Sequence, residues 1–162
     1  MGIFYDRDAL AAARAAWKQQ GKTVVFTHGC YDLLPPGHIR LLEPCRALGD
    51  ILILALNTDA SVARLKGPHR PLIHQNDRAA VALELASVDA VTFFDEDTPR
   101  ELIAAVLPDI LVKGSDWSHF VAGREEVEAA GGKVVLLPLE PGYSTTNIER
   151  DIIERHIPAR LT

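Results

Sequence analysis

The stretch "TVVFTHGCYDLLPPGHIRLL", residues 23–42, passes from an apolar run through glycine, proline and histidine into a helical pattern. The apolar run predicts a buried strand over residues 23–27, and the later pattern predicts a helix over residues 38–48. Gly37 lets the backbone approach a ligand closely. The unpaired N–H groups in the first turn of a helix attract anions. The stretch therefore predicts a strand-to-helix junction that binds an anion.

Strand and helix patterns alternate along the rest of the chain. Helices are predicted over residues 6–19, 57–67, 76–88, 98–107, 123–132 and 144–155, and strands over residues 51–56, 90–94, 109–114 and 133–139. Parallel strands need helical crossovers of this kind. We therefore predict one domain over residues 1–162, with an N-terminal helix in residues 1–21 and a core in residues 22–157. Its fold class is α/β, a Rossmann-like doubly wound parallel sheet of five strands.

The predicted helix over residues 98–107 carries complete start signals. Thr98 is placed to cap it, Pro99 to occupy its first position, and Glu101 to complete a capping box. By contrast, Pro44 lies inside the predicted helix over residues 38–48, where it should kink the helix or remove one backbone hydrogen bond.

Composition excludes several classes of function. The 162 residues carry a net charge of −5, which argues against nucleic acid as a partner. No apolar stretch approaches the ~20 residues of a membrane span, and no signal-peptide core is present at the start. The two cysteines, Cys30 and Cys45, have no metal-site spacing and suit a reducing compartment. We therefore expect a cytoplasmic protein without a membrane partner.

Polar segments follow four of the predicted strands. They read "THGCYDLLPPGH", "NTDASVARLKGPHRPL", "KGSDW" and "PGYSTTNI". They should share the carboxyl edge of the sheet, where ligands of such folds bind. Neither GxxxxGK[ST] nor GxGxxG occurs, which argues against a P-loop kinase and against a dinucleotide dehydrogenase.

Two helix starts in these segments suit a polyphosphate. His38 adds a side-chain donor to the first, and the hydroxyls of Ser144, Thr145 and Thr146 mark the second. Cations are available from Lys66, Arg70 and Arg78, and oxygen ligands for hydroxyls or a metal from Asp32, Asn57, Asp59 and Asp116. Each residue alone has an ordinary structural explanation, so the prediction depends on their joint placement.

Four blocks resemble a known family: "GCYDLLPPGH", "ALNTDASVARLKGPHRPL", "LPDILVKGSDW" and "GYSTTNI". They resemble the cytidylyltransferase-like nucleotidyltransferases with an HxGH motif. Within that family the likeness is to the D-glycero-β-D-manno-heptose 1-phosphate adenylyltransferases, which form the second domain of bifunctional ADP-heptose synthases. It runs from Lys22 to Ile153. Glycerol-3-phosphate cytidylyltransferases are similar but more distant.

The resemblance implies transfer of AMP from ATP to a sugar 1-phosphate, with Mg²⁺, giving an ADP-sugar and pyrophosphate. In lipopolysaccharide precursor synthesis that product is ADP-heptose. It implies a homodimer, and no side-chain cluster for the metal. The implied catalytic residues are His38, Lys66 and Arg78, and the implied acceptor residues are Asp32 and Lys113. The implied nucleotide-binding residues are Thr27, His28, Gly29, Tyr31, Gly37, His38, Asn57, Gly114, Asp116, Trp117, Ser144, Thr145 and Thr146.

The chain departs from the family pattern at two positions. Pro35 stands where the first histidine of the motif belongs, and His28 stands where relatives usually carry asparagine. Proline offers no hydrogen-bond donor. Three accounts stay open: a slow enzyme, an imidazole supplied by His28, or a protein that binds nucleotide without catalysis. A cytidylyltransferase acting on a polyol phosphate is a further alternative.

Overall fold

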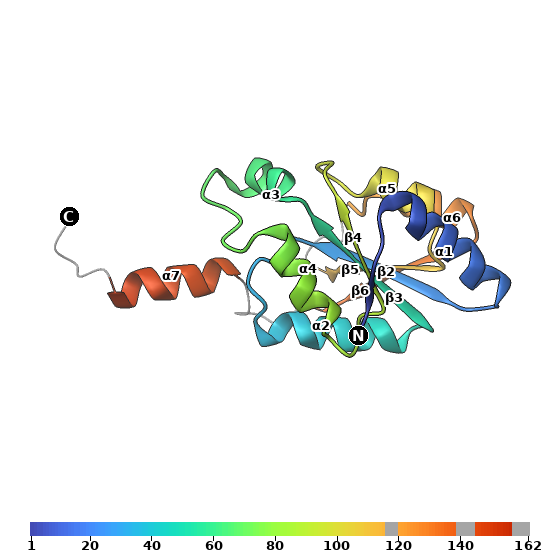
Figure 1. Cartoon of the computed structure of the whole chain (residues 1–162), viewed down its shortest axis with the longest axis horizontal. Helices are drawn as coiled ribbons and strands as arrows, with labels where there is room; N and C mark the ends of the chain where they lie inside the picture. Colours follow the sequence, from blue (N-terminus) through green and yellow to red (C-terminus); the bar gives the residue numbers. More distant parts are fainter. Residues whose placement is uncertain (116–119, 139–144, 157–162) are drawn as a thin grey trace.

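A computed structural model describes residues 1–115, 120–138 and 145–156 of the chain. Its centre is one parallel sheet in the order β1-β4-β3-β2-β5-β6 (Figure 1). The strands are β1 (Ile3–Phe4), β2 (Val24–Gly29), β3 (Ile51–Asn57), β4 (Ala90–Phe94), β5 (Ile110–Gly114) and β6 (Lys133–Leu137). The predicted doubly wound α/β fold is confirmed.

The sheet has one strand more than the five predicted. The addition is β1, which pairs in parallel with β4 through Ile3 opposite Ala90 and Phe4 opposite Val91. Two residues are too few to show the alternation by which strands are recognised in a sequence. The extra strand lies at the edge of the sheet, away from the strand ends that carry the predicted site.

Helices cover both faces of the sheet. They are α1 (Arg7–Gln19), α2 (Pro36–Ala47), α3 (Asp59–Lys66), α4 (Gln75–Leu83), α5 (Arg100–Val106), α6 (Arg124–Ala129) and α7 (Thr145–His156). One core joins α1, α5 and α6 to side chains such as Phe26 and Leu111. The other joins α2 and α4 to side chains such as Val25 and Val112. Successive strand residues point to opposite faces, and Figure 1 shows the sheet between the two groups of helices.

Two predicted helix starts are corrected. Helix α2 begins at Pro36 rather than His38, because a proline in the first position needs no N–H partner. Helix α5 begins at Arg100, and Pro99 rather than Thr98 is its cap. No capping box forms, since Glu101 pairs with Arg7 at 3.7 Å. Thr98 is thereby left facing a cavity.

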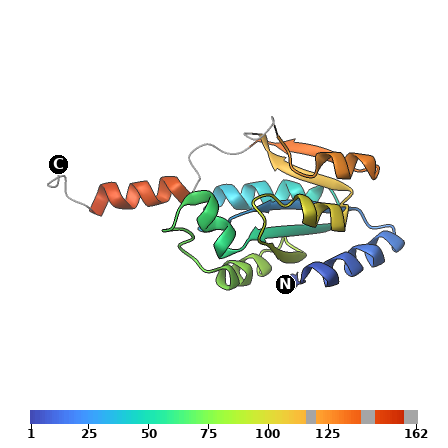
Figure 2. The ribbon, with the colours of Figure 1, turned by 90° about the horizontal axis from the view of Figure 1, so that it is seen from above.

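Helix α7 touches the rest of the molecule only with its first turns among the described contacts. The Thr145 hydroxyl accepts a hydrogen bond from the Leu33 N–H at 3.2 Å, and Glu149 pairs with Arg70 at 3.3 Å. Beyond that point the helix runs away from the sheet (Figures 1 and 2), and residues 150–156 are exposed. Among the described residues, no helix has the length and apolarity to cross a membrane.

Candidate functional site

The strand order reverses between β2 and β5, which are neighbours in the sheet but distant in the chain. Ligands of doubly wound sheets bind at the carboxyl ends of strands where this reversal occurs. A cavity of about 290 Å³ opens there, and we call it the central cavity. It is lined by His28, Gly29, Cys30, Asn57, Leu65, Lys66, Phe94, Asp97, Thr98, Pro99, Lys113, Phe120 and Ala122.

His28 and Lys113 meet in this cavity from adjacent strands. The register of β2 against β5 aligns Val25 with Ile110 and Phe26 with Leu111, which brings the two side chains together two residues further on. Their Nε2 and Nζ atoms are 3.4 Å apart. Burial, with a smaller effect of the Lys113 charge, lowers the pKa of His28 to about 3. The imidazole is therefore neutral at physiological pH and can accept a hydrogen bond from the ammonium group.

The cavity has a second cation and an apolar wall. Lys66 is the last residue of α3, and its exposed side chain makes no hydrogen bond or ion pair with the described residues. Phe94 meets the His28 ring edge-on, with centroids 5.9 Å apart. Burial raises the pKa of Cys30, so its thiol is a poor nucleophile at this site. The cavity thus combines two lysine side chains with an apolar wall.

The starts of α2 and α7 lie beside each other. His38, in the first turn of α2, packs its ring on Tyr31 with centroids 4.6 Å apart. Burial lowers the pKa of His38, partly opposed by an interaction with the backbone of Leu33. Its buried Nδ1 atom has no well-formed hydrogen bond among the described residues. The Leu33 N–H and carbonyl both bond to the Thr145 hydroxyl, which ties the α7 start to the same loop.

Several predicted ligands are instead joined to one another, in what we call the buried arginine network: Asp32, Asp59, Arg70 and Arg78. Asp32 accepts hydrogen bonds from Arg70 at 2.6 Å and from the N–H groups of Leu72 and Ile73 at 2.8 and 2.9 Å. Burial acts to raise the pKa of Asp32, but these hydrogen bonds outweigh it and hold the pKa below its usual value.

Arg78 completes the network beneath the strand ends. Its fully buried guanidinium donates to the carbonyls of Ile73, Cys30 and Asn57 and to the Asp59 carboxylate, at 2.6 to 3.0 Å. Four of the five N–H groups of this side chain are thereby used. The residue joins the ends of β2 and β3, so its described contacts are structural.

The structure brings most of the predicted residues to one edge of the sheet. His28, Gly29, Asn57, Lys66 and Lys113 line the central cavity. Thr27, Tyr31, Gly37, His38 and Thr145 surround the two helix starts, while Gly114 ends β5 and Thr146 is exposed. Asp116, Trp117 and Ser144 lie outside the described residues. The individual roles of all these residues stay predictions.

Sequence reasoning missed the apolar part of the cavity. Leu65, Phe94 and Phe120 line it, and Phe120 is 64% exposed. Phe94 ends a predicted core strand, and the hydrophobic pattern of that strand gives no sign of a ligand. The sequence alone gave no signal for Phe120 either, because its exposure at this edge is a property of the folded chain.

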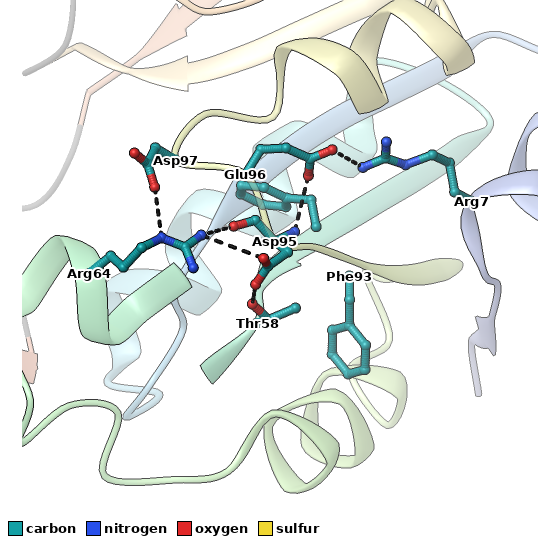
Figure 3. Close-up of a pocket in the computed structure, with 8 residues that line it drawn as sticks. Arg7, Thr58, Arg64, Phe93, Asp95, Glu96 and Asp97 are labelled. Carbon is teal, nitrogen blue, oxygen red and sulfur yellow. Dashed lines mark hydrogen bonds and ion pairs between the residues drawn. The ribbon is translucent and has the colours of Figure 1, made fainter. Parts of the chain in front are cut away.

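A second, shallower hollow of about 630 Å³ lies at the carboxyl end of β4 (Figure 3). Its charged side chains come from α1, α3 and the loop after β4, and they pair with one another. Arg7 pairs with Glu96, and Arg64 pairs with Asp97 at 3.0 Å and with Asp95 at 3.7 Å. The hollow contains none of the predicted site residues, so the central cavity is the candidate site.

Comparison with known proteins agrees with this geometry. Residues 26–151 match the model of the cytidylyltransferase-like family. The chain belongs to this family. Its members are nucleotidyltransferases, and the predicted enzyme class is confirmed at that level. The Rossmann-like arrangement of strand ends and helix starts is the structural basis of that class.

Two curated relatives are named bifunctional protein HldE. The protein of Methylobacillus flagellatus is 53% identical over 146 residues, which cover 90% of this chain and 30% of the relative. The protein of Mesorhizobium japonicum is 57% identical over 142 residues, which cover 86% of this chain and 29% of the relative. The chain therefore spans about 30% of the length of these relatives.

Two solved structures share the fold. The lipopolysaccharide core biosynthesis protein from Thermoplasma volcanium has a TM-score of 0.60 at 30% identity and covers 74% of this chain and 98% of its own. Pantoate-beta-alanine ligase from Francisella tularensis, complexed with beta-gamma ATP and beta-alanine, has a TM-score of 0.63 at 14% identity, covering 95% and 78%. The second likeness shows the fold alone.

Proposed function

We propose that the chain transfers AMP from ATP to D-glycero-β-D-manno-heptose 1-phosphate, giving ADP-heptose and pyrophosphate. The observation that carries the proposal is the junction of two helix starts, at Pro36 and Thr145, at the same edge of the sheet as a cavity lined by Lys66 and Lys113. Helix starts favour phosphate groups, and the cations suit a second anion. The HldE relatives and the lipopolysaccharide protein support this choice of sugar.

The reaction is an in-line displacement at the α-phosphorus of ATP. An oxygen of the sugar phosphate forms the new P–O bond, and the bond to the bridging oxygen breaks, so that pyrophosphate leaves with the electron pair. Such transfers depend on positioning and on stabilisation of developing charge. We assign the α-phosphate to His38, whose ring is held against Tyr31, and the β- and γ-phosphates to the start of α7.

Mg²⁺ is part of this proposal as a companion of the nucleotide. No group of three acidic, histidine or cysteine side chains that could hold a metal occurs in the described part of the chain. Mg²⁺ commonly binds through substrate phosphates and water with one or two carboxylates at most. The ion would neutralise phosphate charge, and we assign no protein ligand to it.

The test is a matrix of donors and acceptors with pyrophosphate release as the readout. ATP or CTP is combined with D-glycero-β-D-manno-heptose 1-phosphate or glycerol 3-phosphate. ATP with the heptose phosphate should give the highest kcat/KM. A preference for CTP with glycerol 3-phosphate would replace the proposal by the polyol alternative. If calorimetry showed ATP binding but no donor–acceptor pair released pyrophosphate, the chain would be a nucleotide-binding protein without this catalytic activity.

His38 is tested against a histidine outside the site. His38→Ala should lower kcat by roughly 10²–10³-fold, because it removes one positioned donor to the transferring phosphate. His69→Ala is the matched control, since His69 is exposed in the loop after α3. Equal kinetics of the two variants would remove His38 from the mechanism.

We also propose a homodimer formed through the second half of α7. Ile152 and Ile153 are 53% and 48% exposed there, and an isolated helical segment of two turns is marginally stable in water. An antiparallel pairing of two copies about Ile152 would set Glu149 of one copy opposite Arg155 of the other, since residues three positions apart share a face of a helix. Light scattering should give the dimer mass, and Ile152→Glu should give the monomer, whereas Val81→Glu on α4 should not.

A further inference from the structure

Helix α7 meets the rest of the molecule with one face of its first two turns. Thr145 and Glu149 are four positions apart, so they lie on the same face of the helix. The buried Thr145 hydroxyl accepts from the Leu33 N–H at 3.2 Å, and Glu149 accepts from Arg70 at 3.3 Å. Residues 150–156 are exposed and run away from the sheet (Figure 2). The attachment of α7 therefore lies at its start, to which the β- and γ-phosphates were assigned.

Arg70 is fixed from the inner side of this contact. Its Nε donates to Asp32 at 2.6 Å, and the Asp32 side chain is 1% exposed. The N–H groups of Leu72 and Ile73 donate to the same carboxylate at 2.8 and 2.9 Å. A guanidinium is planar, and its N–H groups have fixed directions. With Nε held by Asp32, Nη1 is already directed at Glu149, so the pair forms with little reordering of the arginine.

The loop between β2 and α2, residues 30–35, is the common partner of both contacts. Asp32 of this loop reaches α7 through Arg70, and the adjacent Leu33 reaches it directly through Thr145. The Leu33 backbone also interacts with the side chain of His38, in the first turn of α2. The two contacts therefore hold the start of α7 against the segment that leads into α2, and the spacing of the two helix starts depends on them.

We infer that Arg70 and Glu149 form a clasp that docks α7 on the β2–α2 loop, and that this docking assembles the phosphate site from the two helix starts. Arg70 is a positioning residue, because it acts on the site through Glu149. The inference rests on the proposed function, in which the start of α7 binds the β- and γ-phosphates. Glu149 is 37% exposed, so water competes for the pair and the clasp is weak. A triphosphate that spans both helix starts binds only the docked form and stabilises it.

The clasp has a kinetic signature that a purely structural role lacks. Loss of the clasp lowers the fraction of molecules in which α7 is docked, and the apparent affinity for the nucleotide falls by that fraction. Saturating ATP restores the docked form, so kcat should be unchanged while the KM for ATP rises. The KM for the acceptor should be unchanged as well. A general loss of structure would instead reduce the amount of active protein, and with it kcat.

The first experiment reverses one charge of the clasp. Glu149→Lys should raise the KM for ATP by roughly 5–20-fold, less than a fully buried charged hydrogen bond would give, because the site is partly exposed. It should change kcat and the acceptor KM less than about twofold. Glu154→Lys is the matched control, since Glu154 lies on the exposed part of the same helix. Equal KM values for ATP in the two variants would overturn the inference.

A double-mutant cycle identifies Arg70 as the partner. Arg70→Lys keeps a charge but loses the fork that reaches two carboxylates, so its KM for ATP should rise. Adding Glu149→Gln should raise that KM little further, because both changes break the same contact. Additive effects would show that Glu149 acts on another group and would overturn the clasp. Circular dichroism melting identifies a variant that fails to fold.

The dimer proposed above also involves Glu149, so the two roles are separated by oligomeric state. Ile152→Glu should be a monomer in light scattering and should keep the KM for ATP of the parent, because it leaves the clasp intact. A KM for ATP raised as much in Ile152→Glu as in Glu149→Lys would assign the effect to the dimer contact and overturn the clasp.

The second experiment needs no turnover. A non-hydrolysable ATP analogue with Mg²⁺ should slow hydrogen exchange of the α7 backbone amides, because it stabilises the docked helix. D-glycero-β-D-manno-heptose 1-phosphate alone should leave their exchange unchanged. At the same concentration of the analogue, Glu149→Lys should lose most of the protection and Glu154→Lys should keep it.

The outcomes distinguish the clasp from the proposed reaction. Equal protection of α7 in Glu149→Lys and the parent would overturn the clasp, whatever the activity. Pyrophosphate release without any protection of α7 would overturn the clasp and retain the reaction. Protection that depends on Glu149, without pyrophosphate from any donor–acceptor pair, would retain the clasp and reject the reaction.

Discussion

The buried arginine network and the central cavity use the same kinds of side chain at the same edge of the sheet, with opposite results. In the network, Arg70 and Arg78 are 8% and 3% exposed and bond to carboxylates and carbonyls of the chain itself. In the cavity, Lys66 faces a hollow in which the one acid among the described lining residues, Asp97, pairs with Arg64. The network holds the strand ends together, and the cavity leaves charge for a ligand.

The difference shows how position decides the role of a cation. A buried guanidinium must be compensated inside the protein, because an unpaired buried charge costs several kcal/mol. A lysine at the rim of a hollow keeps contact with water until a ligand replaces it. Loss of a network residue should therefore act on folding, and loss of a cavity residue on binding. Four predictions test that division, in order of decreasing effect.

The largest effect is expected for Arg78→Leu. It removes four hydrogen bonds, two to the carbonyls of Cys30 and Asn57 at the ends of β2 and β3 and two to the Ile73 carbonyl and the Asp59 carboxylate. We expect a loss of about 3–5 kcal/mol in the free energy of unfolding, measured by urea denaturation. Arg124→Leu is the control, since its partner Glu128 is half-exposed. A loss below about 1 kcal/mol for Arg78→Leu would show that the network does not support the strand ends.

Asp32→Asn should cost roughly 2–4 kcal/mol at neutral pH and change the pH dependence of stability. The folded pKa of Asp32 is lowered, so its contribution is present above the unfolded pKa of about 3.9 and is lost as pH falls through the folded pKa. The variant should therefore lose less stability than the parent below about pH 4. If urea denaturation gave the same loss of stability with falling pH for the variant and the parent, the role assigned to this carboxylate would be contradicted.

His28 should titrate far below an ordinary histidine. With a pKa lowered to about 3 by burial and by Lys113, its ring should stay neutral in ¹⁵N spectra from pH 8 to pH 5. The unfolded chain takes up this proton near pH 6.5, so stability falls as pH decreases from 6.5 towards 3. His28→Gln should remove that part of the decline. Protonation of His28 near pH 6 would show that the cavity is wetter than its geometry indicates.

The smallest effect is expected in the hollow at the end of β4. Arg64→Met breaks ion pairs with Asp95 and Asp97, both of which are exposed. Exposed pairs contribute about 0–1 kcal/mol, so stability should change by less than that. The KM values for ATP and for the acceptor should change less than about twofold. A large change in either KM would move part of the site into this hollow.

The fold class could be predicted from the sequence because the patterns that indicate strands and helices lie within short segments. Continuous apolar runs such as "ILILAL" mark strands buried on both faces, and the observed β3 confirms this reading. Two local predictions were wrong: strand β1 was not predicted, and the start of α5 was misplaced. Strand β1 has two residues, which are too few to show a period. Helix α5 is capped by Pro99 rather than Thr98, and Glu101 pairs with Arg7 of α1 instead of completing a capping box.

The candidate site was predicted in position but only partly in function. Lys66, Arg70 and Arg78 look alike in the sequence, as cations after one strand. In the structure Lys66 faces the cavity, and the two arginines are joined to Asp32 and Asp59. The sequence contains no sign of these pairings, since they join residues 38 and 19 positions apart.

The amino-acid sequence alone determined the alternation of strands and helices apart from β1, the family, and the edge of the sheet that carries the candidate site. These follow from periodicity and from motifs within short segments, where neighbouring residues act on each other directly. Tertiary structure alone decided which cations are compensated, which face of the sheet His28 and Lys113 share, and how α7 meets α2. Such outcomes depend on burial and on distances between remote segments, and these quantities exist only once the chain has folded.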